Sequence, residues 1–409
     1  MKILFLVGEF PKLSQTFILN QMTGMMDAGH DVTILAKKSA SDAKVHPDVL
    51  NYELMNQVVY YGDSRQSDTR FAKAAVFIRA FCAHLAARFY KKNYIGTISF
   101  RDLLKMPNLI LLIRKLNQID LTDRTTVLAH FGPNGLLAQK CIDLGLLRGR
   151  LFTAFHGYDM LRYVKQKGVN AYQDLFRSPS FILPISDFWK RRCIELGADP
   201  SRIVVHHMGI DLLRFDAHPS QPAKPLIIVS AARLVEKKGL AYGIEAVGRL
   251  IKKGHSVRYL IAGDGPLREK LQQQIETKRL TKQIRLVGWK TQDEWIDLMK
   301  SAQVVLAPSV TASDGDMEGI PVQLMEAMAM RKIVVSTVHS GIPELIQDGE
   351  NGFLFAEKDA DALADLLARI LQSPEKWNRI TQNARRTVKE RFNIQKLNAD
   401  LLRLFAEKG

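Results

Sequence analysis

Two glutamates, Glu318 and Glu326, are separated by seven residues in a segment that follows the apolar run Val304–Ala307. The run predicts a buried strand, and Gly319 and Pro321 favour a tight turn followed by a helix that starts near Pro321. Glu318 then lies at the carboxyl end of a strand, and Glu326 lies about one and a half turns into the helix. Two carboxylates beside a helix N-terminus, which can hold phosphate, fit a ligand with hydroxyls at both ends and phosphates between them: a nucleotide sugar. The alternative is that both are acids favoured by the helix dipole.

A second set of candidate ligands is cationic. Arg233 and Lys238 follow the apolar run Leu226–Ala231, in a loop that ends at Gly239. The planar fork of an arginine and the point charge of a lysine can converge there on a diphosphate. The turn Gly263-Asp264-Gly265-Pro266 follows another predicted strand and has the glycines that a close backbone approach requires. It does not match the dinucleotide fingerprint GxGxxG, and a solvated basic loop is the alternative interpretation of Arg233 and Lys238.

The elements that must position these residues alternate between short apolar strands and amphipathic helices. Continuous apolar runs are typical of strands buried on both faces, which indicates mainly parallel sheets covered by helices. Two successive series of this kind predict an α/β protein with two doubly wound, Rossmann-like domains. The segment 215–225, with three prolines in a short polar stretch, is the expected linker. The predicted strands are Ile3–Val7, Val32–Ala36, Val58–Tyr61, Val127–His130, Leu151–Phe155, Phe181–Ile185 and Val204–His207, then Leu226–Ala231, Val257–Ala262, Ile284–Val287, Val304–Ala307 and Ile333–Ser336.

Composition limits the class of protein. The 409 residues are too many for one hydrophobic core, and 46% hydrophobic and 24% charged residues exclude wholesale disorder. The three cysteines, Cys82, Cys141 and Cys193, form no CxxC pair, which excludes a disulfide scaffold and a Cys-rich zinc site. The first apolar run, Ile3–Val7, is too short for a signal peptide or a membrane span. We therefore expect a cytoplasmic protein that is not integral to a membrane.

The formal net charge is +16, from 58 Lys and Arg against 42 Asp and Glu. A chain with this charge is expected to bind phosphate groups, on nucleic acid, on an anionic membrane or on a small molecule. Between Arg65 and Lys115 eleven Lys and Arg accompany two Asp, and an apolar stripe recurs at helical period from Phe71 to Phe89. This segment is either a core-packed helix with a solvated basic rim or a surface that docks on anionic lipid. Nucleic-acid binding has less support, because no recognition helix and no aromatics interleaved with basic residues are found.

Together these residues resemble the retaining, nucleotide-sugar-dependent glycosyltransferases of the large bacterial family 4, which have the two-domain GT-B fold. The resemblance covers nearly the whole chain. The opening Phe10-Pro-Lys-Leu-Ser14-Gln-Thr16-Phe17 is similar to a subgroup found in exopolysaccharide assembly of the colanic-acid type. The other matching residues are Glu318 and Glu326, Arg233 and Lys238, Gly263–Pro266, Val287-Gly288-Trp289, Gly341-Ile-Pro-Glu344, Gly349-Glu-Asn-Gly352, Thr153-Ala-Phe-His156-Gly-Tyr-Asp159, Pro184-Ile-Ser186, and Gly209-Ile-Asp211 with Phe215.

The resemblance implies a role for each matching residue. Arg233 and Lys238 would bind the donor diphosphate and neutralise the leaving group. Glu318 would orient the donor sugar, Glu326 would bind the ribose hydroxyls, and His156 would hydrogen-bond the donor sugar or the developing oxocarbenium site. The expected catalytic residues are therefore His156, Arg233, Lys238 and Glu318. Further donor contacts are expected from Gly263, Gly265, Pro266, Val287, Gly288, Trp289, Lys290, Gly319, Ile320, Pro321 and Val322. Acceptor-side residues are expected to be Gly8, Phe10, Ser14, Thr16, His130, Gly132 and Asp159.

The implied reaction is retaining transfer of a hexosyl group from a UDP-sugar, or a GDP-sugar, to a polyprenyl-diphosphate-linked oligosaccharide in exopolysaccharide or surface polysaccharide biosynthesis. Residues 1–211 would bind the acceptor across a central cleft from the donor domain, residues 212–385, and a helix of about residues 386–409 would pack back on the first domain. The Arg65–Lys115 segment would hold the enzyme at the anionic inner membrane. An epimerase or a phosphorylase of the same fold is the alternative, and a nucleic-acid or nucleotide-binding protein without activity is a remote one. The donor sugar, the linkage, the route to retention and the oligomeric state stay open.

No metal and no cofactor are expected. Asp314-Gly-Asp316 has the Asp-x-Asp spacing that binds metal and diphosphate in the other glycosyltransferase fold, GT-A. Here it lies in a polar turn, and Arg233 and Lys238 already supply the positive charge. The pair His206-His207 closes a predicted strand, where core or surface histidines are more common than metal ligands.

Overall fold

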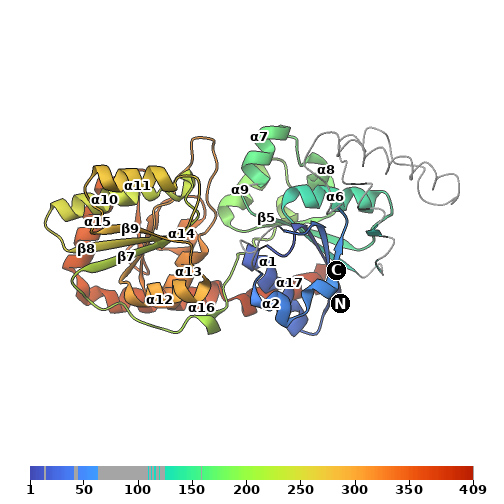
Figure 1. Ribbon diagram of the computed structural model, residues 1–409. Coiled ribbons are helices and arrows are strands. Elements are labelled where there is room, and N and C mark those ends of the chain that lie inside the picture. Colours follow the sequence, from blue (N-terminus) through green and yellow to red (C-terminus); the bar gives the residue numbers. More distant parts are fainter. Residues whose placement is uncertain are drawn as a thin grey trace.

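The computed structural model describes residues 1–12, 15–40, 45–62, 109, 112, 115–116, 119, 125–157 and 159–408 (Figure 1). Most of the basic segment Arg65–Lys115 lies outside the described residues, and so does Ser14. No helix in the described ranges is both long enough and apolar enough to cross a membrane.

The first sheet is parallel throughout and has the strand order β3-β2-β1-β4-β5-β6. This is the doubly wound order, with its switch point between β1 and β4. In the register Leu4 pairs with Thr33 of β2 on one side and with Val127 of β4 on the other, so β1 is central. Six of the seven strands predicted here are confirmed: β1 (Lys2–Glu9), β2 (Asp31–Lys38), β3 (Val58–Tyr60), β4 (Thr126–His130), β5 (Arg150–Phe155) and β6 (Phe181–Pro184).

The seventh predicted strand, Val204–His207, is wrong. The segment runs beside β6, and Val204 N donates to Ile182 O and His206 N donates to Pro184 O, each at 3.0 Å. A parallel ladder also needs an N–H from β6 between these two bonds. That position is Pro184, which has no N–H to donate, so the pairing stays incomplete.

The second sheet repeats the first. Its order, β12-β11-β10-β7-β8-β9, is again doubly wound, with the switch point between β7 and β10. All five predicted strands are confirmed, and the short edge strand β12 adds a sixth that the sequence analysis missed. The strands are β7 (Leu226–Ala231), β8 (Val257–Ala262), β9 (Ile284–Gly288), β10 (Val304–Ala307), β11 (Ile333–Thr337) and β12 (Phe353–Phe355). The predicted pair of doubly wound α/β domains is thereby confirmed.

Helices cover both faces of each sheet. In the first domain one face packs against α6, α8 and α9, and the other packs against α1, α2 and α17. In the second domain α10, α11 and α15 cover one face, and α12, α13, α14 and α16 cover the other. The helices are α1 (Thr16–Asp27), α2 (Pro47–Asn51), α6 (Gly132–Asp143), α7 (Val164–Lys167), α8 (Gln173–Arg177), α9 (Asp187–Glu195), α10 (Leu240–Lys252), α11 (Arg268–Thr277), α12 (Gln292–Ser301), α13 (Val322–Ala329), α14 (Ile342–Leu345), α15 (Ala360–Gln372), α16 (Trp377–Arg391) and α17 (Ile394–Lys408).

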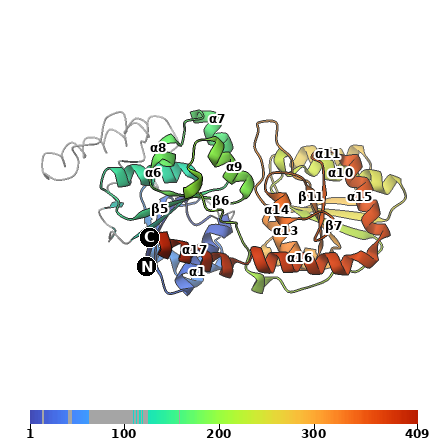
Figure 2. The same ribbon diagram turned by 180° about the vertical axis from the view of Figure 1, so that it is seen from behind.

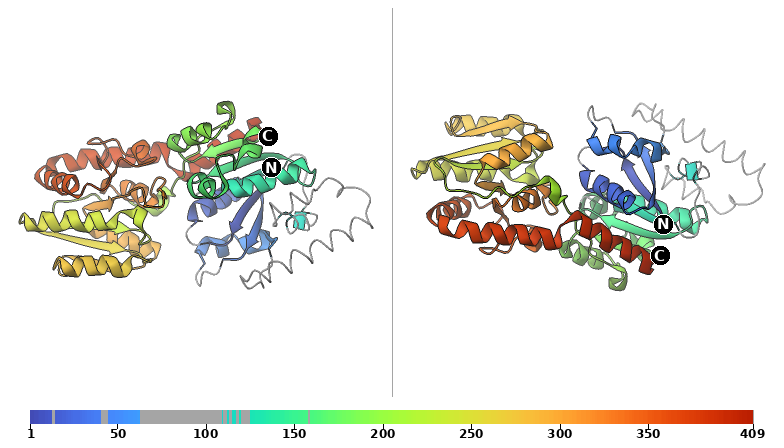
Figure 3. Two further views of the ribbon diagram at one scale, coloured as in Figure 1. Left: turned by 90° about the horizontal axis from the view of Figure 1, so that it is seen from above. Right: turned by 90° about the horizontal axis from the view of Figure 1, so that it is seen from below.

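The chain returns to the first domain at its end. Helix α16 lies against α13 in the second domain, and α17 lies against α1 in the first (Figure 2). The two helices run along one side of the molecule and join the domains, which lie side by side (Figure 3). Where the chain crosses, Ile210 N donates to Phe392 O and Ile394 N donates to Ile210 O, each at 3.0 Å. The part that packs on the first domain, expected from about residue 386, starts at Ile394.

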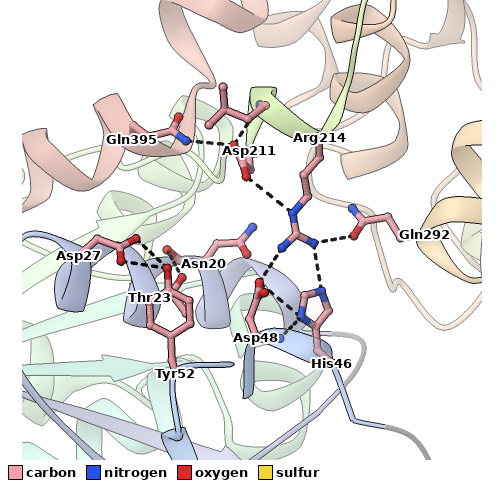
Figure 4. A network of polar contacts seen from close by, with 11 residues as sticks. Asn20, Thr23, Asp27, His46, Asp48, Tyr52, Asp211, Arg214, Gln292 and Gln395 are labelled. Carbon is pink, nitrogen blue, oxygen red and sulfur yellow. Dashed lines mark hydrogen bonds and ion pairs between the residues drawn. The ribbon is translucent and has the colours of Figure 1, made fainter. Parts of the chain in front are cut away.

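Arg214 stabilises the point where the chain first passes from the first domain to the second (Figure 4). It ends the short 3₁₀ helix η5 (Leu212–Arg214). Its guanidinium donates to Asp48 Oδ2 of α2 at 2.8 Å and to Gln292 Oε1 of α12 at 3.1 Å. One side chain therefore contacts both domains next to the linker.

Candidate active site

The carboxyl ends of the two sheets face each other. Lys165, in α7 after β5, donates from Nζ to Asp314 O in the loop after β10, at 3.0 Å. Ile185, directly after β6, lies so close to Gly319 that a Cβ on this glycine would be 3.0 Å from Ile185 Cδ1. Doubly wound sheets bind ligands outside the carboxyl ends of their strands, at the switch point. Both switch points therefore open toward the region where the domains meet.

The loops after β7 and β10 meet in an ion pair between Lys238 and Glu318. The two side chains are 19% and 15% exposed, so the pair is largely shielded from water but can still be reached. Burial raises the pKa of Glu318, but the charges of Lys238 and Lys237 outweigh burial and hold this pKa below its ordinary value. The sequence-predicted sugar-binding carboxylate and one predicted phosphate-binding cation are thus brought together as a charged pair.

The position of Lys238 is fixed by its neighbours in the chain. It ends the 3₁₀ helix η6 (Glu236–Lys238), and Gly239 follows with a φ of +63°. A Cβ on Gly239 would lie 1.7 Å from Pro308 O, so only glycine fits between the two loops. Lys237 donates to Asp316 Oδ2 and to Met317 O, each at 3.2 Å, and so ties the same two loops together.

Arg233 is exposed, and within the described part of the chain its guanidinium makes no hydrogen bond or ion pair. Its loop is supported by the predicted glycine turn. A Cβ on Gly263 would be 1.8 Å from Ala232 O, and one on Gly265 would be 2.8 Å from Leu234 N. The glycines therefore allow this turn to pack behind the Arg233 loop, and direct donor contacts from Gly263, Gly265 and Pro266 stay predictions.

The predicted turn and helix after Glu318 are present. Pro321 is the N-cap of α13 and Val322 is its first residue, and no side chain of the described residues caps this end. Gly319 and the buried Ile320 form the turn. Gln323 Oε1 accepts a hydrogen bond from Ala231 N, at the end of β7, at 2.7 Å. The first amides of α13 thus lie beside the Arg233 loop, where they can contact an anion.

Glu326 has a partner that the sequence analysis did not identify. Trp295, in α12, is buried and donates from Nε1 to Glu326 Oε2 at 2.9 Å. Burial raises the pKa of Glu326 to about 7, although the indole hydrogen bond lowers it. Unlike Glu318, this carboxyl carries no compensating cation in the described structure.

The raised pKa of the buried Glu326 carboxyl predicts that the stability of the protein depends on pH. Because the folded-state pKa of Glu326 is raised above 4.5, the folded protein binds this proton more tightly, and its stability falls as pH rises from about 4.5 to about 7. Glu326→Gln keeps an acceptor for Trp295 and removes the titration. We expect the variant to gain about 2–3 kcal/mol relative to the wild type between pH 5 and pH 8. Urea unfolding at both pH values measures the two free energies of unfolding. If the difference between variant and wild type is the same at pH 5 and pH 8, the raised pKa of Glu326 is contradicted.

The resemblance implies that residues 287–290 line the base pocket of the donor site, and they lie at the end of the edge strand β9 and just after it. The pairing of β8 with β9 shifts register between Ile261 and Ala262, and Gly288 has a φ of +74°. Trp289 is 53% exposed, and Lys290 forms an exposed ion pair with Glu294 at 3.3 Å. Val287 belongs to β9 itself. Their role in holding a base stays a prediction.

In the first domain His156 follows β5 and lies in an aromatic cluster. Its ring centroid is 4.9 Å from that of Phe17 and 4.6 Å from that of Phe131. His156 Nε2 lies 3.1 Å from His130 Nδ1, so one histidine donates to the other. Burial lowers the pKa of His156 to about 3, and the nearby His206 adds to this effect, so the ring is neutral at pH 7. His130 is fully buried, behind His156 rather than at the surface.

Asp159, which was expected among the acceptor-side residues, lies beneath the loops that follow β4 and β5. It is fully buried, and its carboxylate accepts from Gly132 N and from His156 N, each at 3.0 Å. Burial raises its pKa to about 6, although these amides lower it. The side chain thus ties the loop after β4 to the loop after β5. This contact network places Asp159 as a support for His156, and direct acceptor contact stays a prediction.

The other acceptor-side residues lie at the end of β1 and the start of α1. Gly8 is in β1, Thr16 begins α1, and Phe10 is buried. Tyr60 donates from its hydroxyl to Phe10 O at 2.8 Å, which anchors the intervening loop to β3. Ser14 cannot be placed, because it lies outside the described residues.

Glu344 contacts the other domain, a role that no spacing indicated. Asp187 N and Phe188 N, in the first turn of α9, donate to its two oxygens at 2.9 and 3.0 Å. His207 Nε2 lies 3.2 Å from Glu344 Oε2. The dipole of α9 favours a carboxylate at this end. Of the adjacent histidines His206 and His207, His207 thus contacts a carboxylate, and His206 Nε2 lies 3.1 Å from the side-chain nitrogen of Gln21.

The Asp314-Gly-Asp316 turn is held by protein contacts. Asp316 pairs with Lys237, and Asp314 Oδ1 accepts from Asp316 N at 2.9 Å. Among the residues that the structure describes, no three His, Cys, Asp or Glu side chains are grouped so that they could hold a metal ion.

Comparison with known proteins identifies the family. A family model described as glycosyl transferases group 1 matches residues 214–387. The putative colanic acid biosynthesis glycosyltransferase WcaL of Escherichia coli (strain K12) is 38% identical over 408 residues, which is 99% of both chains. The chain belongs to the group 1 glycosyltransferases. The amylovoran biosynthesis glycosyltransferase AmsK of Erwinia amylovora is 37% identical over 397 residues, 96% of each chain. The predicted family and its exopolysaccharide-type subgroup are confirmed.

Solved structures share the fold of the whole chain. HepE of Anabaena has a TM-score of 0.73 at 17% identity and covers 100% of both chains. A glycosyltransferase of Rickettsia africae has a TM-score of 0.70 at 18% identity, and the match covers 100% of this chain and 98% of that one. The GT-B fold predicted for this glycosyltransferase is confirmed.

Proposed function

We propose that this glycosyltransferase moves a hexosyl group, with retention and without a metal, from a nucleoside diphosphate sugar to a lipid-linked oligosaccharide in exopolysaccharide biosynthesis. The observation that carries the proposal is the Lys238–Glu318 ion pair at the switch point of the second sheet. It joins a carboxylate suited to sugar hydroxyls with a cation suited to a phosphate. The exposed guanidinium of Arg233 lies on the same loop and is free, among the described residues, to add a bidentate contact.

The residues account for the chemistry as follows. The bond between the anomeric carbon and the β-phosphate oxygen breaks, and its electron pair stays on the departing diphosphate. Lys238, which is largely shielded from water, and the exposed Arg233 stabilise that developing charge. The acceptor hydroxyl then bonds to the anomeric carbon from the same face and gives its proton to the departing phosphate. The neutral imidazole of His156, across from the donor loops, hydrogen-bonds the sugar.

Relatives support the choice of substrates. The relatives that match almost the whole chain are named for colanic acid and amylovoran biosynthesis. Among proteins of the same fold, HepE has been solved in complex with UDP and with UDP-glucose. A UDP-sugar is therefore the favoured donor, and a GDP-sugar is the second choice.

Calorimetric titration with UDP and with GDP, in buffer with a metal chelator, tests the donor site. We expect one of the two nucleotides to bind, and we expect Arg233→Ala and Lys238→Ala each to weaken it about 10- to 100-fold, because each removes a charge-assisted contact. Lys253→Ala, which removes an exposed lysine paired with Asp365, is the control and should bind as the wild type does. If neither nucleotide binds the wild type, the donor site is wrong.

A lipid-linked acceptor requires the enzyme to work at a membrane. We propose that it is a cytoplasmic protein peripheral to the inner membrane, and that the basic segment Arg65–Lys115 contacts anionic lipid. Sedimentation with vesicles that contain phosphatidylglycerol should pull down the protein in 20 mM salt and release most of it in about 500 mM salt, since screening weakens such contacts. Vesicles of phosphatidylcholine alone are the control. Absence of binding at low salt would rule out this surface.

A further inference from the structure

The backbone of Glu318 is held by a side chain that plays no part in the chemistry above. Glu318 N donates to His339 Nε2 at 2.9 Å, and the imidazole of His339 is completely shielded from solvent. The other ring nitrogen, Nδ1, lies 2.5 Å from Glu357 Oε1. A backbone N–H can only donate, so Nε2 accepts and the proton of the neutral ring is on Nδ1, from which it is donated to Glu357.

Glu357 holds the same loop at a second point. Its Oε2 accepts from Thr311 N at 2.7 Å. The three strands β10, β11 and β12 are neighbours in the sheet, and Glu318, His339 and Glu357 each follow the carboxyl end of one of them. The contacts therefore run across the edge of the sheet, from β12 through β11 to the loop after β10.

Apart from the Lys238–Glu318 ion pair, the other polar contacts of this loop act on residues before Glu318. Glu236 accepts from Ser313 N at 2.9 Å, and Lys237 contacts Asp316 and Met317 O. These contacts fix the loop as far as the residue before Glu318. In the described structure, His339 accepts the hydrogen bond of the Glu318 amide, and so acts on the direction in which the Glu318 carboxylate leaves the backbone toward Lys238.

We propose that His339, supported by Glu357, is a positioning residue that sets the orientation of the Glu318 carboxylate toward the donor sugar. This inference rests on the proposed function, because it assigns the sugar and not the nucleotide to Glu318. Its consequence is specific: His339 governs how much more tightly a nucleotide sugar binds than the free nucleoside diphosphate.

The test compares these two affinities. For the wild type, calorimetry first selects the tightest donor among UDP-glucose, UDP-galactose and GDP-mannose, together with its free nucleotide. His339→Phe keeps a ring of similar size and removes both hydrogen bonds, and we expect it to weaken the nucleotide sugar about tenfold and the free nucleotide less than twofold. His339→Gln offers an acceptor to the Glu318 amide and should recover most of the loss. In a Glu318→Gln background, His339→Phe should have no further effect on the ratio, because the group that it positions is gone.

Several results would overturn the inference. Equal losses for sugar and nucleotide would mean that His339 only stabilises the fold, and no loss at all would mean that it does not position Glu318. If His339→Phe does not fold, Glu357→Gln, at a side chain 25% exposed, provides the measurement, with an expected loss of about threefold for the sugar alone. His218→Phe, at an exposed histidine, is the matched control. A wild type that binds no nucleotide rejects the proposed function as well, whereas a wild type that binds, with an unchanged ratio in the variants, rejects only the role of His339.

Discussion

Lys238→Ala is expected to lower turnover about a thousandfold, the loss that follows when one group that stabilises developing charge is removed from an enzyme site. Lys238 is partly buried, and the Gly239 turn against Pro308 holds it in place. When its ammonium group is removed, water therefore cannot supply a positive charge at the same position. Steady-state release of the nucleoside diphosphate from the donor measures the effect. Lys253→Ala, which removes an exposed lysine that follows α10 and pairs with Asp365 of α15, should keep wild-type turnover.

Part of this loss comes from Glu318. Without Lys238, burial of the Glu318 carboxylate is no longer offset by its nearest cation, and its pKa is expected to rise. A variant with both Lys238→Ala and Glu318→Gln should therefore lose less activity than the product of the two single losses. Strictly multiplicative losses would show that the ion pair does not couple the two residues.

The sheets, and the place of Lys238 and Glu318 at the carboxyl ends of their strands, could be predicted because parallel α/β domains bury their strands on both faces. The runs at Leu226–Ala231 and Val304–Ala307 are continuously apolar, and both are strands in the structure. Ligands bind at the carboxyl ends of such strands, so Lys238 and Glu318, which follow two of them, were candidates for binding the donor. Their direct ion pair confirms the juxtaposition that the spacing alone only suggested.

The supporting residues could not be predicted, because their partners are distant in the chain. Glu344 contacts α9 about 157 positions away, and His339 contacts the Glu318 amide 21 positions away across neighbouring strands. No periodicity or local motif records such pairs. The glycine turn at Gly263 indicated that another group lies close to its backbone. That group is the loop that carries Arg233, which the sequence analysis did not identify. The wrong strand at Val204–His207 has a similar cause, because its pairing depends on the missing N–H of Pro184 in another segment.

The last prediction concerns Asp159, whose replacement by alanine is expected to cost both stability and activity. The carboxylate is fully buried and satisfies Gly132 N and His156 N, so Asp159→Ala leaves both amides without partners. Leaving buried donors unpaired costs about 1–3 kcal/mol each, and we expect the free energy of unfolding to fall by about 3 kcal/mol. Because the His156 loop loses its anchor, turnover should fall about 100-fold even where the protein remains folded.

The pH dependence separates this role from a charged role in the site. The pKa of Asp159 is raised to about 6, so the folded state binds its proton more tightly than the unfolded state does, and the carboxyl contributes less to stability as pH rises from about 4 to about 6. The stability lost in Asp159→Ala should therefore be larger at pH 4.5 than at pH 7.5, as urea unfolding can measure. Asp174→Ala, at an exposed position in α8, should change neither stability nor turnover. A loss that instead grows with pH would mean that a cation compensates the ionised carboxylate, and the assignment of Asp159 as a link between two backbone amides would then be wrong.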